Sequence, residues 1–90
     1  MALTVSRHAA RRMVQDGISL AEVRETLRTG RTIETYPEDT PYPSRLVLGW
    51  IAGRPIHVVA GDGPEETIVI TAYRPDPIRW DETFSVRRPR

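Results

Sequence analysis

Apolar residues in the first thirty positions recur every three or four residues, which is the spacing of amphipathic helices. The first run predicts a helix from about Arg7 to Asp16. Ser6 can cap its start with a side-chain oxygen, and Gly17 is suited to end it. The apolar stripe of this helix comprises Ala9, Ala10, Met13 and Val14.

A second helix is expected to begin after Ser19. Glu22 follows three residues later, so the two residues have the pattern of a capping box, in which each side chain bonds the other's backbone amide. Val23 and Leu27 form the core face of this helix, and Gly30 is suited to end it. The first third of the chain therefore predicts a hairpin of two short helices.

Beyond this hairpin the pattern changes to runs that are typical of β-strands. Between the runs lie a proline-rich loop at 37–44, a tight turn at Ala52 and Gly53, and a third connection at 61–66. Because none of these connections can hold a crossover helix, we expect an antiparallel meander. The four runs are Thr32 to Tyr36, Arg45 to Ile51, Pro55 to Ala60 and Thr67 to Arg74.

These elements predict an α+β fold with two N-terminal helices on an antiparallel sheet of about four strands. A chain of 90 residues has room for one core, so we expect a single domain over 1–90. Trp80 is expected to anchor the last part of the chain, and residues 87–90 are expected to be disordered unless they reach a partner. The parts are a helical hairpin at 1–30, a sheet at 31–74 and a Pro- and Arg-rich tail at 75–90.

Composition places the chain among globular proteins, with 39% hydrophobic and 28% charged residues. No run approaches the ~18 apolar residues needed to cross a bilayer, and Met1 to Arg12 lacks the apolar centre of a signal peptide. We therefore expect a cytoplasmic protein that does not enter membranes. The absence of cysteine fits a reducing compartment. Because so small a body leaves much surface exposed, a homodimer is also considered.

Every one of the 13 basic residues is an arginine, although the formal net charge is only +1. The forked guanidinium group binds phosphate through paired hydrogen bonds, so this bias permits a nucleic-acid partner such as RNA. The alternative is a solvated surface in a protein from an arginine-rich proteome. Candidate phosphate-binding residues are Arg12, Arg45 and Arg54.

The two histidines, His8 and His57, are the candidate acid and base groups. Arg12 follows His8 by one helical turn, so both side chains can address one anion. A packed histidine in a strand, and a surface histidine in a helix, are the ordinary alternatives. No glycine-rich phosphate loop, HExxH pattern or calcium-loop spacing is present, so no metal or cofactor is expected.

Thr71 and Tyr73 alternate along the last strand and are expected to share a face with Val69. If Ala52 and Gly53 form a two-residue turn, Leu48 lies opposite His57. His57 then lies on the face that carries Leu46, Leu48 and Trp50. The alternative interpretation of Thr71 and Tyr73 is that both are good strand formers on a half-buried surface.

The stretches SRHAARRMVQDGIS, RPIHVV and ITAYRPDPIRW resemble the domain of unknown function family 4258 over most of the chain. That family is similar to bacterial toxins of the RelE and BrnT type, in which two N-terminal helices lie on a strongly curved, four-stranded antiparallel sheet. The resemblance implies a small antitoxin-like protein partner. It also implies a functional role for five polar positions, which are His8, Arg12, His57, Thr71 and Tyr73.

The resemblance further implies a metal-independent ribonuclease, in which a ribose 2′-hydroxyl attacks the neighbouring phosphate. His57 would take the 2′ proton and His8 would protonate the leaving oxygen, because a free imidazole has a pKa near ~6.5. Arg12 would hold the phosphate, while Thr71 and Tyr73 would stabilise the developing charge. The alternatives are a module that binds protein or nucleic acid without cleavage, and a subunit with a purely structural role.

Overall fold

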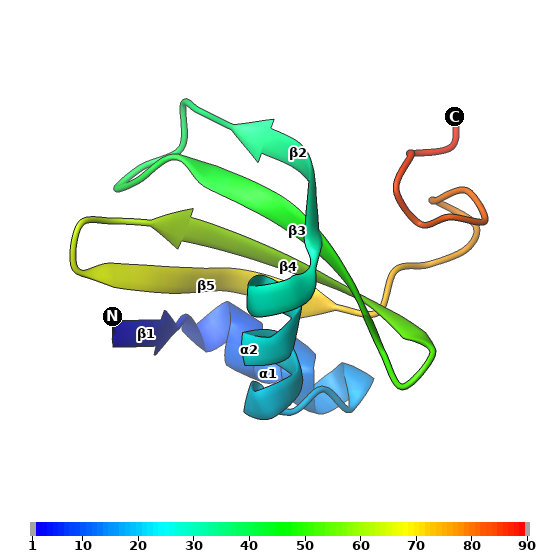
Figure 1. Ribbon diagram of the computed structural model, residues 1–90, viewed down its shortest axis with the longest axis horizontal. Helices are drawn as coiled ribbons and strands as arrows, with labels where there is room; N and C mark the ends of the chain where they lie inside the picture. The colour runs from blue at the N-terminus through cyan, green and yellow to red at the C-terminus, as the bar shows by residue number, and fades with distance from the viewer. Residues whose placement is uncertain (1, 90) are drawn as a thin grey trace.

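The computed structural model describes residues 2–89 and has two helices and five strands, which is an α+β fold. The strands form one curved sheet, and both helices lie below it in the view of Figure 1. In chain order the elements are β1 (Ala2–Val5), α1 (Arg7–Asp16), α2 (Leu20–Thr29), β2 (Arg31–Tyr36), β3 (Ser44–Ile51), β4 (Arg54–Asp62) and β5 (Glu66–Tyr73).

Local caps set the ends of both helices, as the sequence predicts. The Ser6 side chain accepts a hydrogen bond from the amide of Ala9, and Gly17 closes α1 in the left-handed conformation with φ 65°. Ser19 and Glu22 make both bonds of the capping box at the start of α2. These bonds satisfy amides that a free helix end would leave without partners.

The sheet has the strand order β1-β5-β4-β3-β2. The four strands from β2 to β5 are antiparallel neighbours, which confirms the predicted meander. The number of strands and the purely antiparallel arrangement are corrected, because β1 is a fifth strand that pairs in parallel with β5. Four residues are too few to give a clear strand pattern, and their partner lies more than sixty residues away.

The turn between β3 and β4 has the predicted two residues, Ala52 and Gly53, with φ values of 52° and 74°. Leu48 consequently pairs with His57. Between β4 and β5 the register shifts next to Val59, so Val69 faces the helices and Thr71 does not. The expectation that Thr71 and Tyr73 share a face with Val69 was therefore wrong, because both lie on the face of His57.

The core lies between the helices and one face of the sheet. Strand residues on this face alternate with residues that point to the opposite face, so His57 points away from the helices. Leu46 and Leu48 are buried on that opposite face. The core cluster comprises Ala9, Met13, Ile18, Val23, Ile56, Val58, Val69 and Ala72.

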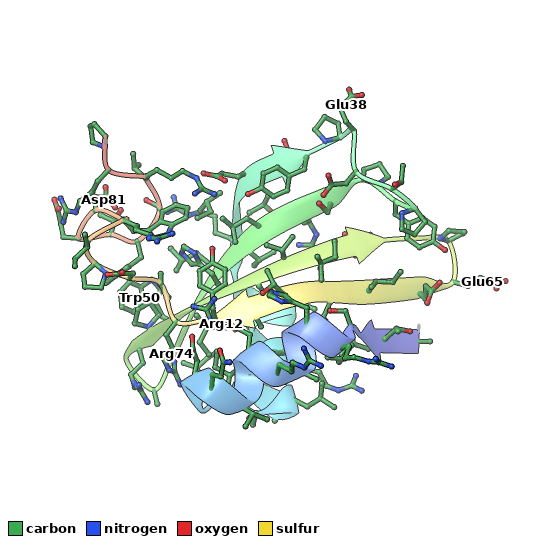
Figure 2. The ribbon with its side chains drawn as sticks, turned by 180° about the vertical axis from the view of Figure 1, so that it is seen from behind. Arg12, Glu38, Trp50, Glu65, Arg74 and Asp81 are labelled. Carbon is green, nitrogen blue, oxygen red and sulfur yellow. The ribbon has the colours of Figure 1, made fainter. Side chains whose placement is uncertain are left out.

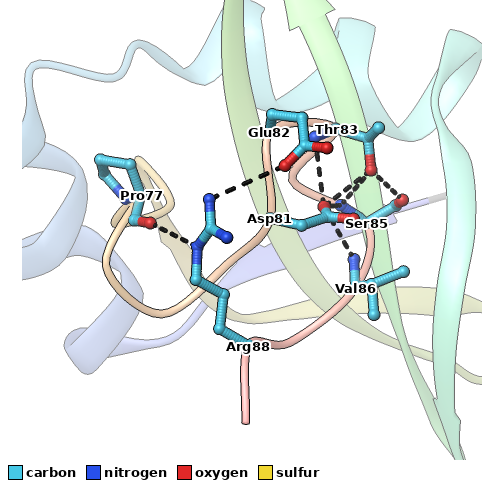
Figure 3. Close-up of polar contacts among 7 residues, drawn as sticks. All are labelled: Pro77, Asp81, Glu82, Thr83, Ser85, Val86 and Arg88. Atoms are coloured by element: carbon cyan, nitrogen blue, oxygen red, sulfur yellow. Dashed lines mark hydrogen bonds and ion pairs between the residues drawn. The ribbon is translucent and has the colours of Figure 1, made fainter.

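Residues 75–89, here called the C-terminal segment, cover part of the sheet face that carries His57. Trp80 is only 3% exposed, which confirms it as the anchor. The carboxylate of Asp81 accepts bonds from the backbone of Thr83, Ser85 and Val86, which gives the segment a fixed turn (Figure 3). The expected disorder of the last residues is corrected up to position 89, and position 90 lies outside the described residues. Within 2–89, the structure has no helix long and apolar enough to cross a membrane.

Candidate functional site

The start of α1 lies beside β5 at the place where β1 ends. Strand β1 pairs with β5 only as far as Val69. The hydroxyl of Ser6 then donates to the carbonyl of Ile70 over 2.9 Å, which ties the first turn of α1 to the next part of β5. Side chains from α1 can therefore reach residues 71–73 of β5.

His8 meets Thr71 at this junction. The imidazole Nε2 lies 3.1 Å from the hydroxyl oxygen of Thr71, although the two residues are 63 positions apart. His8 is exposed to solvent, and Thr71 is half-buried. The structure thus brings together two of the residues that the sequence singled out.

Arg12 lies one turn further along α1 and meets Tyr73. Its guanidinium carbon is 5.2 Å from the centre of the Tyr73 ring, within the range of a cation–π contact. Arg12 also pairs with Asp16 at a distance of 3.5 Å. We call His8, Arg12, Thr71 and Tyr73 the α1–β5 row, and Figure 2 labels Arg12 within it.

His57 is fully buried, and both of its ring nitrogens have partners. Nε2 lies 2.7 Å from the carbonyl oxygen of Phe84. Because a carbonyl can only accept, Nε2 carries the proton, and Nδ1 accepts the phenolic proton of Tyr73 over 3.1 Å. The indole of Trp80 packs edge-on against the imidazole, with ring centres 4.5 Å apart.

Burial sets the protonation states of this pair. It lowers the pKa of His57, and the Phe84 carbonyl and the Glu34 carboxylate oppose that shift only in part. It raises the pKa of Tyr73, against the influence of the nearby guanidinium of Arg87. Both side chains are therefore neutral at pH 7.

The enclosure of His57 differs from the expectation that this residue meets a substrate directly. In the structure, Trp80 and Phe84 separate its ring from solvent. The two histidines nevertheless approach one side of the sheet, because His8 reaches Thr71 and His57 reaches Tyr73, two residues further along β5. The sequence predicted Trp80 as an anchor of the last part of the chain, but it did not indicate that Trp80 packs on His57.

The other two candidate phosphate-binding residues lie away from this row. The Nε of Arg45 donates to Asp62 over 2.7 Å, and Arg54 is exposed next to the β3–β4 turn. The residues that do join Arg12 and Tyr73 in lining a cleft are Arg74, Asp76, Arg79, Trp80 and Arg87. Most of these belong to the C-terminal segment, for which the sequence offered two signals, the expected anchor Trp80 and the richness of the tail in arginine.

Arg87 fastens the C-terminal segment to β2. Two nitrogens of its guanidinium donate to the carboxylate of Glu34 at 2.9 and 3.0 Å, while Tyr36 donates to the same carboxylate. This pairing raises the pKa of Arg87 and lowers that of Glu34. Burial and the bond to Glu34 raise the pKa of Tyr36 to about 12. The site is thus charged where Arg87 pairs with Glu34, and it is neutral around His57 and Tyr73.

Among residues 2–89, no three His, Asp or Glu side chains gather closely enough to hold a metal ion. The side chains of the site offer an exposed imidazole, a half-buried phenol, a hydroxyl and several guanidinium groups.

Comparison with known proteins gives the chain a family. The curated proteins and the solved structures contain no match to it, so the expected similarity to RelE-type and BrnT-type toxins stays a prediction. Residues 5–74 match a family that is described as Domain of unknown function (DUF4258). This stretch includes the whole α1–β5 row and His57, and it ends just before the C-terminal segment. Because the match spans well over half of the chain, the protein belongs to the DUF4258 family.

Proposed function

We propose that this protein is a ribonuclease that cleaves RNA by attack of a ribose 2′-hydroxyl on the adjacent phosphate. The α1–β5 row is the observation that carries this proposal, because His8 and Arg12 each contact a hydroxyl-bearing residue of one strand. The reaction needs a base, a cation beside the phosphate and donors for the developing charge. This row supplies all three from side chains, without a metal ion.

His8 is assigned as the general base. Its imidazole is exposed, and the hydroxyl of Thr71 lies 3.1 Å from Nε2, at a distance that a substrate hydroxyl could also take. His57 has both ring nitrogens occupied, so His8 takes the role that was first expected of His57. The 2′ proton would pass to Nε2 of His8.

Arg12 is assigned to the phosphate. Its guanidinium would hold the non-bridging oxygens, and its N–H groups would donate hydrogen bonds to the charge that develops on the phosphorane. Tyr73 remains a phenol because burial raises its pKa, and its one O–H goes to Nδ1 of His57, so its part is to hold the Arg12 guanidinium over its ring. His57 acts as a positioning residue, since its Nδ1 fixes the orientation of the Tyr73 hydroxyl.

The bonds of the step balance without a co-reactant. The 2′ oxygen bonds to phosphorus while the bond from phosphorus to the 5′ oxygen breaks. The 2′ proton goes to His8, and the leaving 5′ oxygen takes a proton from water. The hydroxide that this leaves takes the proton back from His8, which restores the free base. The products are a 2′,3′-cyclic phosphate on one fragment and a 5′-hydroxyl on the other.

The test is incubation of the purified protein with end-labelled RNA in EDTA. We expect fragments that end in a cyclic phosphate, and we expect His8→Gln to lose roughly 100-fold or more of the rate, as is typical when a general base is removed. Arg11→Gln is the matched control, because Arg11 is exposed on the same helix and lies outside the row. Intact RNA with the wild type, or equal cleavage by His8→Gln, would refute the proposal.

A module that binds nucleic acid without cleaving it is the second candidate. The enclosure of His57 favours it, because only one imidazole of the described residues is left exposed. Such a module would lose affinity gradually as arginines are removed and as salt rises. Its binding would not depend on His8.

A protein partner completes the proposal. The resemblance to toxins of toxin–antitoxin pairs implies a small antitoxin-like protein. Large apolar side chains that remain exposed, such as Val14 and Ile78, are consistent with a covered surface. Light scattering after gel filtration would separate a homodimer from a monomer, and co-purification of a small protein with the tagged chain from its native cells would test the hetero-complex.

A further inference from the structure

A cleft separates the α1–β5 row from the C-terminal segment, and arginines line both of its walls. Arg12 and Arg74 stand on the side of α1 and β5. Arg79 and Arg87 stand on the side of the C-terminal segment. Figure 2 labels Arg12 and Arg74, which lie together at the point where the chain leaves β5. We call this feature the arginine cleft.

Many guanidinium donors of the first wall are not used by the protein. A guanidinium carries five N–H groups. Arg12 meets its carboxylate partner, Asp16, at 3.5 Å, and Arg74 meets Glu22 at 3.6 Å, both longer than a charge-assisted hydrogen bond. One nitrogen of Arg74, Nη1, donates to the carbonyl of Pro55 over 3.3 Å. The Nε of Arg74 is buried and has no acceptor among the described residues. A ligand cannot reach this buried donor, but the side chain of Arg12 is 40% exposed, so its unused N–H groups can bind an acceptor in the cleft.

The second wall has one engaged and one free arginine. Arg87 directs two nitrogens to Glu34, and its guanidinium also lies 4.6 Å from the centre of the Trp80 ring. Arg79 is exposed, and its side chain makes no hydrogen bond or ion pair with any residue of 2–89. Its full set of donors is therefore available to a ligand.

One carboxylate lines the cleft against four guanidinium groups. That carboxylate belongs to Asp76, and its Oδ1 already accepts the amide of Ile78 over 2.8 Å. The lining thus favours an anion with several acceptor oxygens over a cation or a neutral ligand. A phosphate group fits this description, because its oxygens match the forked geometry of arginine.

The wall formed by the C-terminal segment has a defined position. The amide of Arg88 donates to the carbonyl of Arg79 over 2.8 Å, and Trp80 and Arg87 form an isolated antiparallel bridge. Figure 3 shows the Asp81 turn that closes the loop between them. Because these contacts hold the backbone of Arg79, its guanidinium is restricted to the neighbourhood of the cleft.

We propose that the arginine cleft binds a backbone phosphate of single-stranded nucleic acid, and that Arg79 is its principal ligand from the C-terminal segment. Phosphate binding there rests on the proposed function, because Arg12 and Tyr73 belong to both the cleft and the α1–β5 row. A phosphate in the cleft would neighbour the phosphate that is cleaved. The C-terminal segment, which lies beyond the family match, is thus half of the binding site.

The test uses fluorescence anisotropy with a dye-labelled, ten-nucleotide single-stranded DNA, which binds but has no 2′-hydroxyl to cleave. We expect the affinity to fall as potassium chloride rises. Arg79→Gln should lower the affinity about five-fold to ten-fold and reduce the salt slope by about one phosphate contact. Arg79→Lys should restore only part of the affinity, since an ammonium group lacks the fork.

Arg11→Gln is the control, because it removes the same charge from an exposed site outside the cleft. Its affinity should stay within about two-fold of the wild type. Equal losses in Arg79→Gln and Arg11→Gln would overturn the proposal, since they would indicate only diffuse charge. Thermal denaturation of each variant verifies that the fold is kept. Tighter binding of a phosphoserine peptide than of the DNA would overturn the assignment to nucleic acid.

The outcomes also separate this inference from the proposed ribonuclease. DNA binding that depends on Arg79, together with intact RNA in the cleavage assay, would support the cleft and refute the catalytic role of His8. Cleavage that depends on His8 but is indifferent to Arg79 would support the ribonuclease and refute the cleft.

Discussion

The fold keeps the imidazole of His57 neutral through its hydrogen bonds and its burial. The imidazole donates to the carbonyl of Phe84 and accepts from the hydroxyl of Tyr73, so protonation of Nδ1 would break the second bond. Burial adds to this effect and lowers its pKa below the value of a free imidazole. The residue therefore contributes to stability only while it stays uncharged.

The pH dependence of stability follows from this shift. The unfolded chain binds a proton at His57 near pH ~6.5, before the folded protein does. The contribution of His57 is thus fully present above pH ~6.5 and is lost as the pH falls through the lower pKa of the folded state. We expect the melting temperature of the wild type to fall more between pH 7.5 and pH 5.5 than that of His57→Gln.

The control for this measurement is His8→Gln, because His8 is exposed and its removal leaves the buried pair intact. The melting temperature of His8→Gln should fall between pH 7.5 and pH 5.5 by as much as that of the wild type. The acidic residues are common to all three proteins and cancel in the comparison. If His57→Gln and the wild type lose equal stability over this window, His57 is not held neutral by the fold.

At the scale of the elements, the β3–β4 turn carries a residue in an unfavourable conformation. Ala52 has φ 52°, in the left-handed region where a side chain with Cβ is disfavoured. Asparagine tolerates this region and is the preferred first residue of such a turn. We expect Ala52→Asn to raise the free energy of unfolding by about 0.5 to 1 kcal/mol, as measured by urea denaturation.

Gly53 provides the opposite substitution in the same turn. It has φ 74°, and an added Cβ would meet no atom within 4 Å, so any cost of Gly53→Ala is conformational. That variant should lose about 1 kcal/mol. A loss of stability in Ala52→Asn would contradict the assigned turn.

The elements that could be predicted from the sequence are those whose signals are local. Ser19 and Glu22 mark the start of α2 because the capping box lies within four residues. The turn at Ala52 and Gly53 fixes the pairing of Leu48 with His57. Strand β1 could not be predicted, because its pairing with β5 depends on a contact across most of the chain.

The candidate site divides in the same way. The spacing of His8 and Arg12 on one helical face was visible in the sequence, and both side chains do reach β5. The register shift next to Val59 was not visible, and it decides which face Thr71 occupies. The cover over His57 was also missed, because a segment rich in proline and arginine shows no periodic pattern of apolar residues.

At the scale of the whole molecule, the sheet is covered on both faces by different means. The helices cover one face with apolar side chains, whereas the C-terminal segment covers part of the other through Trp80, Phe84 and Arg87. The family match ends before this segment, so the cover lies outside the part of the chain that defines the family. The C-terminal segment therefore decides whether His57 is available for chemistry.

Removal of Trp80 tests that dependence. Trp80 is nearly fully buried against the His57 ring, and burial is the largest cause of the lowered pKa of His57. In Trp80→Ala we expect the pKa of His57 to rise toward ~6.5, as measured by NMR titration of the imidazole C–H signals. The segment can detach locally, so the loss of stability should stay below the ~3 to 5 kcal/mol that is typical when a core tryptophan is removed.

Val86→Ala is the matched control, because Val86 lies in the same segment and is 60% exposed. It should leave the pKa of His57 unchanged. A low pKa that persists in Trp80→Ala would mean that the sheet itself buries His57, and the segment would then have no part in its state. A raised pKa would mean that the segment holds His57 neutral. Displacement of one short segment would then give the α1–β5 row a second accessible imidazole, beside Tyr73.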